Sequence, residues 1–329
     1  MTSLAPVLQA FFTDRLQTQR GASPHTVAAY RDTFRLLLNF AWQRTGRQPA
    51  QLDLGDLDVT LIVAFLQHLE NDRGNKPATR NARLAAVHSL FRYAAFRCPE
   101  IAGTIQQVLA IDGKNTTRTE VCFLTGPEAQ ALLGAPDRNR RIGRRDHALL
   151  QLVTQTGLRV SEVTALTCAD IRLGAGPHVR CTGKGRKQRC VPLAPATVAA
   201  LRDYLEEYRG LPHEPFFPSP RGQHLSRDAI AQIVARHART AACSCDTLHA
   251  KNVTPHTLRH TAAMALLHAG VDIAVIALWL GHESIQTTQA YLHADMTLKQ
   301  RALARTTPPD APPGCYRAPD DLLAFLDAL

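Results

Sequence analysis

The sequence has little that would indicate a secreted, disulfide-linked or nucleotide-hydrolysing protein. Its opening stretch, MTSLAPVLQAFFTDRLQ, has neither a basic start nor an unbroken apolar run, so we expect no signal peptide. The eight cysteines include no CxxC pair, and no Walker A motif occurs in the 329 residues. We therefore expect a cytosolic protein with free thiols and no requirement for ATP.

Metal-ligand patterns are scarce too. The one spacing worth weighing as a zinc site is CSCDTLH, with Cys243, Cys245 and His249. A structural zinc ion takes four ligands, and no fourth is evident in the sequence. Small buried or loop cysteines explain the stretch better, and we predict no metal site and no cofactor.

A single stretch, residues 262–280, resembles a membrane span. His268, Gly270 and Asp272 interrupt it, and an aspartate at the middle of a membrane costs about 3 kcal/mol. Two buried helices joined at residues 269–270 are the better interpretation. We expect no membrane partner.

Positive charge is abundant and unevenly distributed. The net charge is +10, made up of +4 in residues 1–110, +9 in residues 111–305 and −3 in residues 306–329. The middle of the chain therefore faces a polyanion, with nucleic acid the natural candidate. A basic ribosomal or membrane-surface protein would share this charge.

Helical periodicity dominates residues 1–108, which we predict to form a helical domain. One helix is predicted to begin after a Ser23 cap, with Pro24 in its first turn, and to end at Gly46. Residues 109–120 are polar and without periodicity, which suits a linker.

A second domain, in which the pattern changes, is predicted over residues 121–305. A helix there ends at Gly157, a β-hairpin spans residues 178–193 with GKGRK at its tip, and helices follow to about residue 305. Residues 306–329 are a Pro-rich break and a short tail helix. The predicted fold class is mainly α with a small β-hairpin or sheet.

Four short segments in the second domain carry chemically active side chains: TGLRVSE, GKGRK, PHTLRH and LGHESIQTTQAYLH. Each side chain alone has an ordinary explanation, such as a surface arginine, a solvated turn lysine, a capping histidine or a core tyrosine. The candidate residues are Arg159, Lys184, His256, Arg259, His282 and Tyr291.

Together these six residues fit attack on a phosphodiester without a metal ion. Two guanidiniums can bind the nonbridging oxygens and stabilise the charge of the transition state. A tyrosine hydroxyl is a usable nucleophile if an imidazole accepts its proton, and a lysine can protonate the leaving alkoxide. A two-metal nuclease would need clustered carboxylates, whereas the charged groups here are mostly cationic.

The same motifs resemble those of the tyrosine recombinase (phage integrase) family, with Xer-type recombinases and transposon-borne integrases nearest. TGLRVSE, GKGRKQRCVPL, HTLRHTAA and LGHESIQTTQAYLH occur in the family's order and spacing, and the resemblance covers nearly the whole chain. It implies an N-terminal helical, SAM-like core-binding domain followed by a mixed α/β catalytic domain.

The resemblance also assigns roles. It implies that Tyr291 becomes a 3′-phosphotyrosine and that Arg159 and Arg259 grip the scissile phosphate. It implies that Lys184 is the general acid and His256 the general acid and base.

Two further residues fall on family positions. His282, where some relatives carry tryptophan, is implied to hydrogen-bond the phosphate, and Glu162 is implied to orient the neighbouring arginine. The remaining basic side chains are predicted to contact backbone phosphates of double-stranded DNA, or else to form a solvated charged surface. These are Arg138, Arg140, Arg141, Arg144, Arg145, Lys187 and Arg189.

The leading hypothesis is a tetramer that recombines two DNA sites through a Holliday junction, with or without a related recombinase, for integration, excision or transposition of a mobile element. The tail segment DLLAFLDAL, with Leu322, Leu323 and Phe325, would dock on a neighbouring protomer or else be disordered. Resolution of chromosome or plasmid dimers uses the same active site. A type IB topoisomerase and a non-catalytic DNA-binding protein would also fit parts of the pattern. We expect the protein at the nucleoid.

Overall fold

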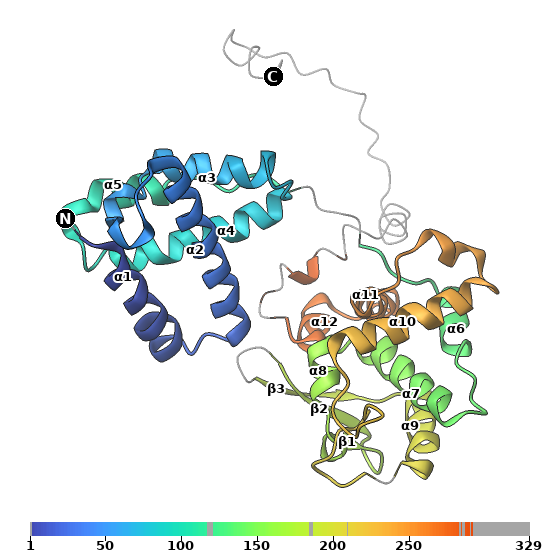
Figure 1. Ribbon diagram of the computed structural model, residues 1–329. Coiled ribbons are helices and arrows are strands. Elements are labelled where there is room, and N and C mark those ends of the chain that lie inside the picture. The colour runs from blue at the N-terminus through green and yellow to red at the C-terminus, as the bar shows by residue number, and fades with distance from the viewer. Residues whose placement is uncertain are drawn as a thin grey trace, which may run out of the picture. The chain divides into compact units, whose positions relative to one another are not determined.

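The computed structural model describes residues 2–116, 121–183, 187–208 and 210–282, together with residues 284, 287–289 and 291. The chain divides into two compact units, Met1–Thr119 and Glu120–Leu329. Figure 1 labels the helices and strands of each unit. Lys184 and the tail residues 306–329 lie outside the described residues.

The first unit is built from helices, as its periodicity predicts. Its longest helix confirms the predicted signals: Ser23 Oγ accepts a hydrogen bond from the Thr26 amide at 3.2 Å, and the helix ends at Gly46 with φ of 71°. Phe11, Phe65 and Phe91 are fully buried in its core. The helices are α1 Leu4–Ala10, the π-helix η1 Phe11–Gln19, α2 Pro24–Thr45, α3 Val59–Asn71, α4 Pro77–Ala94 and α5 Ala102–Leu109, with short 3-10 turns at Pro49–Gln51, Leu54–Asp56 and Pro99–Ile101.

The second unit combines helices with one antiparallel sheet of strand order β1-β2-β3 (Figure 1). The strands β1 Ile171–Arg172, β2 His178–Thr182 and β3 Gln188–Pro192 include the predicted hairpin, in which Val179 pairs with Val191. The predicted fold class is thereby confirmed. The helices are α6 Gly126–Gly134, α7 Arg141–Thr156, α8 Val160–Ala165, α9 Pro195–Glu207, α10 Arg227–Ala242, α11 Pro255–His268 and α12 Ile273–Leu280, with 3-10 turns at Cys168–Asp170 and Asp246–Ala250.

The apolar stretch 262–280 forms two helices, as predicted. Helix α11 ends at His268 and α12 begins at Ile273, with Gly270 between them at φ of 80°. Within the described part of the chain, no helix is both long and apolar enough to cross a membrane.

In the second unit, the C-terminal ends of α7 and α12 lie close to the N-terminal end of α8. Helix α7 ends at Gly157, whose φ is 65°, and α8 starts directly after Arg159. Helix α11 packs against both α7 and α12. An added Cβ at Gly157 would lie 2.6 Å from Cδ2 of Leu280, so a glycine is needed where α7 and α12 approach. This arrangement brings together the described residues of three sequence motifs, TGLRVSE, PHTLRH and LGHESIQTTQAYLH.

Candidate active site

The start of α11 presents the first part of the site. Thr254 caps the helix by accepting a hydrogen bond from the Thr257 amide at 3.2 Å, and Pro255 occupies its first turn, as the sequence predicts. Arg259 lies one turn further along and is only 3% exposed. Its two terminal nitrogens donate to the carbonyl oxygens of Gly157 at 2.6 Å and Leu280 at 2.8 Å. These bonds fix a buried cation in place.

Arg259 keeps its charge despite this burial. Burial, with the neighbouring charge of Arg159, lowers the pKa of Arg259 to about 10. The guanidinium therefore stays protonated at neutral pH. Its two hydrogen bonds to described residues use two of five N–H donors, which leaves donors for a bound anion.

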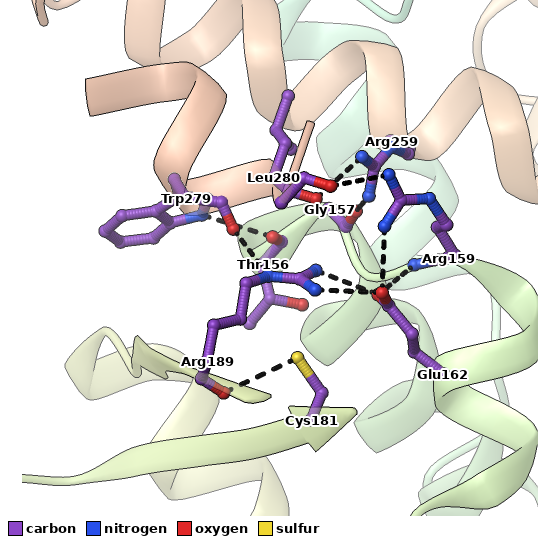
Figure 2. A network of polar contacts seen from close by, with 10 residues as sticks. Thr156, Gly157, Arg159, Glu162, Cys181, Arg189, Arg259, Trp279 and Leu280 are labelled. Carbon is purple, nitrogen blue, oxygen red and sulfur yellow. Dashed lines mark hydrogen bonds and ion pairs between the residues drawn. The ribbon is translucent and has the colours of Figure 1, made fainter. Parts of the chain in front are cut away.

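Arg159 supplies a second guanidinium at the N-cap of α8. Nη1 donates to Oε1 of Glu162 at 3.0 Å, and Nη2 donates to the Gly281 carbonyl at 2.7 Å. Its side chain is 33% exposed, so it is accessible to a ligand. The predicted contact between Glu162 and Arg159 is present, and Figure 2 shows both arginines close to the end of α12.

Glu162 is shared between two arginines. It is 3% exposed, and its two oxygens also accept bonds from Nη1 and Nη2 of Arg189, each at 2.8 Å. Burial alone raises the pKa of Glu162, but the hydrogen bonds from Arg189 and from the Arg159 amide outweigh it and hold the pKa below its usual range. The carboxylate is therefore ionised at neutral pH.

Tyr291 lies beside an imidazole that the sequence motifs did not single out. Its hydroxyl oxygen is 3.0 Å from Nδ1 of His260, and the tyrosine is 3% exposed. Burial raises the pKa of Tyr291 above its usual value, and the charges of Arg259 and Arg159 offset only part of that rise. Burial and then the neighbouring His256 and Arg259 lower the pKa of His260 to about 4, so this imidazole is neutral and can accept a proton.

Two more imidazoles belong to the cluster: His256 lies beside His260, and His282 lies beside Tyr291. The rings of His256 and His260 lie 4.1 Å apart, and the ring of His282 stacks on that of Tyr291 at 6.4 Å. Nδ1 of His282 is 2.6 Å from the hydroxyl of Thr288. Burial and the charges of three arginines lower the pKa of His282 to about 4, so its ring is also neutral at pH 7.

The structure thus brings together five of the six predicted residues, with Lys184 outside the described part. His260 is the residue that the sequence reasoning missed. The signal was present in PHTLRH, because His256 and His260 are four residues apart and share one helix face. Spacing alone does not say which of the two rings reaches the tyrosine.

The predicted backbone-contact residues fall into two groups. Arg138, Arg140, Arg141 and Lys187 are exposed, although Arg140 also forms an exposed ion pair with Asp137 at 3.3 Å. Arg144, Arg145 and Arg189 are less exposed and form ion pairs with Glu207, Asp146 and Glu162, respectively. The side chain of Arg189 is 13% exposed, and such burial does not fit a surface cation that waits for a backbone phosphate.

The cysteine stretch shows no metal geometry. Cys243 is exposed, and the Sγ atom of Cys245 contacts the hydroxyl of Thr247 at 3.4 Å. Within the described ranges, no group of three or more histidine, cysteine, aspartate or glutamate side chains is arranged to hold a metal ion.

Comparisons with known proteins match both units of the chain to one family. Residues 122–297 match the phage integrase family, and residues 10–97 match the phage integrase N-terminal SAM-like domain. The chain is 52% identical to the integrase/recombinase y4rC of Sinorhizobium fredii over 99% of its own length and 98% of that protein. It is 34% identical to tyrosine recombinase XerC of Pelobacter propionicus over 85% of its length and 88% of that protein.

Solved structures share the fold. A Tn1549 transposon integrase in complex with circular intermediate DNA matches with a TM-score of 0.68 and 15% identity, over 91% of this chain and 99% of that one. The XerH recombinase bound to its difH substrate matches with a TM-score of 0.67 and 21% identity, over 87% of this chain and 81% of that one. From the family match and the identity to y4rC and XerC, the chain belongs to the phage integrase family of tyrosine recombinases, enzymes that cut and rejoin DNA.

Proposed function

We propose that this recombinase cuts and rejoins double-stranded DNA at specific sites through a 3′-phosphotyrosine at Tyr291. The observation that carries the proposal is the 3.0 Å contact between the Tyr291 hydroxyl and Nδ1 of His260, in a buried cluster where Arg159 and Arg259 both influence the charge of that hydroxyl. A nucleophile, a neutral base and two cations are the groups that metal-independent phosphoryl transfer needs.

The scissile phosphate would sit between the two arginines. The Tyr291 oxygen attacks phosphorus while its proton passes to Nδ1 of His260, and the bond from phosphorus to the 5′ oxygen breaks. The leaving oxygen takes a proton from Lys184, the general acid that the family resemblance implies. Reversing these transfers with a new 5′ hydroxyl rejoins the strand, so no nucleotide is consumed.

His260 takes the role of proton acceptor that the resemblance alone gives to His256. Only His260 contacts the tyrosine hydroxyl among the imidazoles of the described residues. A bound phosphate would offset the positive charge of Arg259, which helps to lower the pKa of His260. Binding of DNA therefore makes His260 a stronger base at the moment when it is needed.

His282 would hydrogen-bond the phosphate. If the Thr288 hydroxyl donates to Nδ1, the ring proton lies on Nε2 and can be donated to a nonbridging oxygen. Arg138, Arg140, Arg141 and Lys187, all exposed, would contact the DNA backbone.

The proposed assembly is a tetramer on two DNA sites at the nucleoid, alone or with a related recombinase. We propose residues 1–108 as the core-binding domain, 109–120 as the linker, 121–305 as the catalytic domain and 306–329 as a tail that docks on a neighbouring protomer. The 52% identity to an integrase/recombinase favours integration, excision or transposition of a mobile element. The 34% identity to a XerC recombinase supports dimer resolution as the second candidate.

A nicked suicide substrate tests the chemistry. Candidate sites come from the ends of the genomic region that encodes the protein, and the reaction runs in EDTA without ATP. We expect wild type to form a denaturant-resistant protein–DNA adduct and Tyr291→Phe to form none while binding DNA equally well. Specific binding without any wild-type adduct would favour a non-catalytic DNA-binding protein.

A further inference from the structure

Arg189 has an unusual set of partners for a residue of a basic hairpin. It lies on β3, and its guanidinium forms a bidentate ion pair with Glu162, in which both N–O distances are 2.8 Å. Its Nε donates to the Trp279 carbonyl at 2.9 Å. Planar bidentate pairing is the strongest geometry that a guanidinium and a carboxylate can adopt. Arg189 is therefore fixed inside the protein.

The end of α12 receives three arginines, each from a different segment. The carbonyl oxygens of Trp279, Leu280 and Gly281 accept bonds from Arg189, Arg259 and Arg159, respectively, and Figure 2 shows these guanidiniums converging there. The last carbonyls of a helix lack partners within the helix and carry its negative end. This helix end thus holds three cations in a defined arrangement.

Arg189 and Arg159 compete for one carboxylate. Oε1 of Glu162 accepts from Nη1 of Arg189 at 2.8 Å and from Nη1 of Arg159 at 3.0 Å. Without Arg189, Oε1 of Glu162 would be left to the Arg159 side chain, and Oε2 would keep only the bond from the Arg159 amide at 2.8 Å. A bidentate ion pair with Glu162 would then draw the Arg159 side chain away from the Gly281 carbonyl and from any bound anion.

Charge in the cluster favours an anion. Three guanidiniums face a single carboxylate in this network, and Arg159 is the most exposed of the three at 33%. Arg189 neutralises Glu162, so the charges of Arg159 and Arg259 remain for the phosphate.

We infer that Arg189 is a positioning residue of the phosphate-binding site: by occupying Glu162 and the Trp279 carbonyl, it keeps Arg159 turned toward the scissile phosphate. This inference rests on the proposed function. It differs from a backbone contact, because Arg189 acts through Arg159 and does not itself touch DNA.

The test measures DNA affinity and cleavage rate separately, with the full chain and the suicide substrate. Arg189→Met, Arg189→Lys and Glu162→Gln are compared with Arg180→Met. The control removes an arginine from the neighbouring strand β2 that pairs with Asp170 at 3.2 Å and is half exposed. The affinity is measured over a series of salt concentrations, and the rate of adduct formation is measured at saturating protein.

We expect Arg189→Met to bind DNA with unchanged salt dependence and to form the adduct about 100-fold more slowly, because a misplaced catalytic group loses rate on this scale. Arg189→Lys keeps the charge but not the bidentate geometry, so it should form the adduct about tenfold more slowly than wild type. If the methionine variant does not fold, the lysine variant decides. Combining Arg189→Met with Glu162→Gln should add little further loss, because both act through Arg159. The control should match wild type in both measurements.

An Arg189→Met protein with a normal rate and a salt dependence lowered by about one unit would show a backbone-phosphate contact and overturn the inference. Losses that multiply in the double variant would also overturn it, since the two residues would act independently. A wild type that forms no adduct overturns the proposed function and the inference with it. A normal wild type with an unimpaired Arg189→Met overturns the inference alone.

Discussion

Gly281 is the position at which the geometry of the arginine network can be tested by adding one methyl group. Its φ is 64°, and an added Cβ would lie 2.8 Å from Nη1 of Arg189. Gly270 is a matched control, because its φ is 80° and an added Cβ there meets nothing within 4 Å. Both alanine variants force a left-handed residue, and only Gly281→Ala must also displace Arg189.

The expected free energies differ accordingly. A left-handed alanine costs about 1 kcal/mol of folding free energy in either variant. Displacing Nη1 of Arg189 from Oε1 of Glu162 costs about 2 kcal/mol more, since a hydrogen bond between charged groups is lost. A domain of this size loses roughly 3 °C of melting temperature per kcal/mol, which predicts a drop of about 9 °C for Gly281→Ala and about 3 °C for Gly270→Ala.

Differential scanning calorimetry measures the melting temperatures, and the suicide-substrate assay measures cleavage by the same two proteins. We expect Gly281→Ala also to lose adduct formation, because its Arg189 no longer occupies Glu162. Equal melting temperatures for the two variants, with wild-type cleavage by Gly281→Ala, would refute the packing of Arg189 against this glycine.

Three further outcomes follow from the site. His260→Gln should slow adduct formation about 100-fold, the usual scale for losing a general base, and more than His256→Gln does; equal losses would contradict the choice of base. The combined Arg138→Gln and Arg140→Gln variant should weaken DNA binding and lower the salt dependence by about two units, with the cleavage rate at saturating protein unchanged; an unchanged salt dependence would remove both residues from the DNA contact. In the folded protein His260 and His282 each have a pKa of about 4, against 6.5 ordinarily. The unfolded chain therefore takes up protons first, and the free energy of unfolding should fall as the pH drops from 6.5 to 4. A variant with both His260→Gln and His282→Gln should show a flatter decline, and a decline as steep as that of wild type would contradict this.

Local signals in the sequence were sufficient to predict much of the fold. The cap at Thr254, the helix end at Gly157 and the strand pairing of residues 178–193 depend on neighbours in the chain, and all three are present. Backbone preferences and hydrogen-bonding side chains act over a few residues, so motifs of that length specify such features.

The partners of individual side chains could not be predicted in the same way. The hydrogen bond between His260 and Tyr291 joins residues that are 31 positions apart in the sequence, and the bond from Arg189 to the Trp279 carbonyl spans 90 positions. Both depend on how β3, α11 and α12 pack, which no periodicity records. A basic hairpin predicts exposed cations, and the buried Glu162 is what reverses that expectation for Arg189.

The most direct test of the account is to locate the covalent bond. The adduct formed in EDTA on a suicide substrate is digested with nuclease and trypsin, and the peptide that carries the residual nucleotide is fragmented in a mass spectrometer. We predict a phosphodiester on the Tyr291 oxygen, attached to the 3′ end of the cleaved strand. A nucleotide on any other side chain, or an adduct that appears only when a divalent metal is supplied, would contradict it.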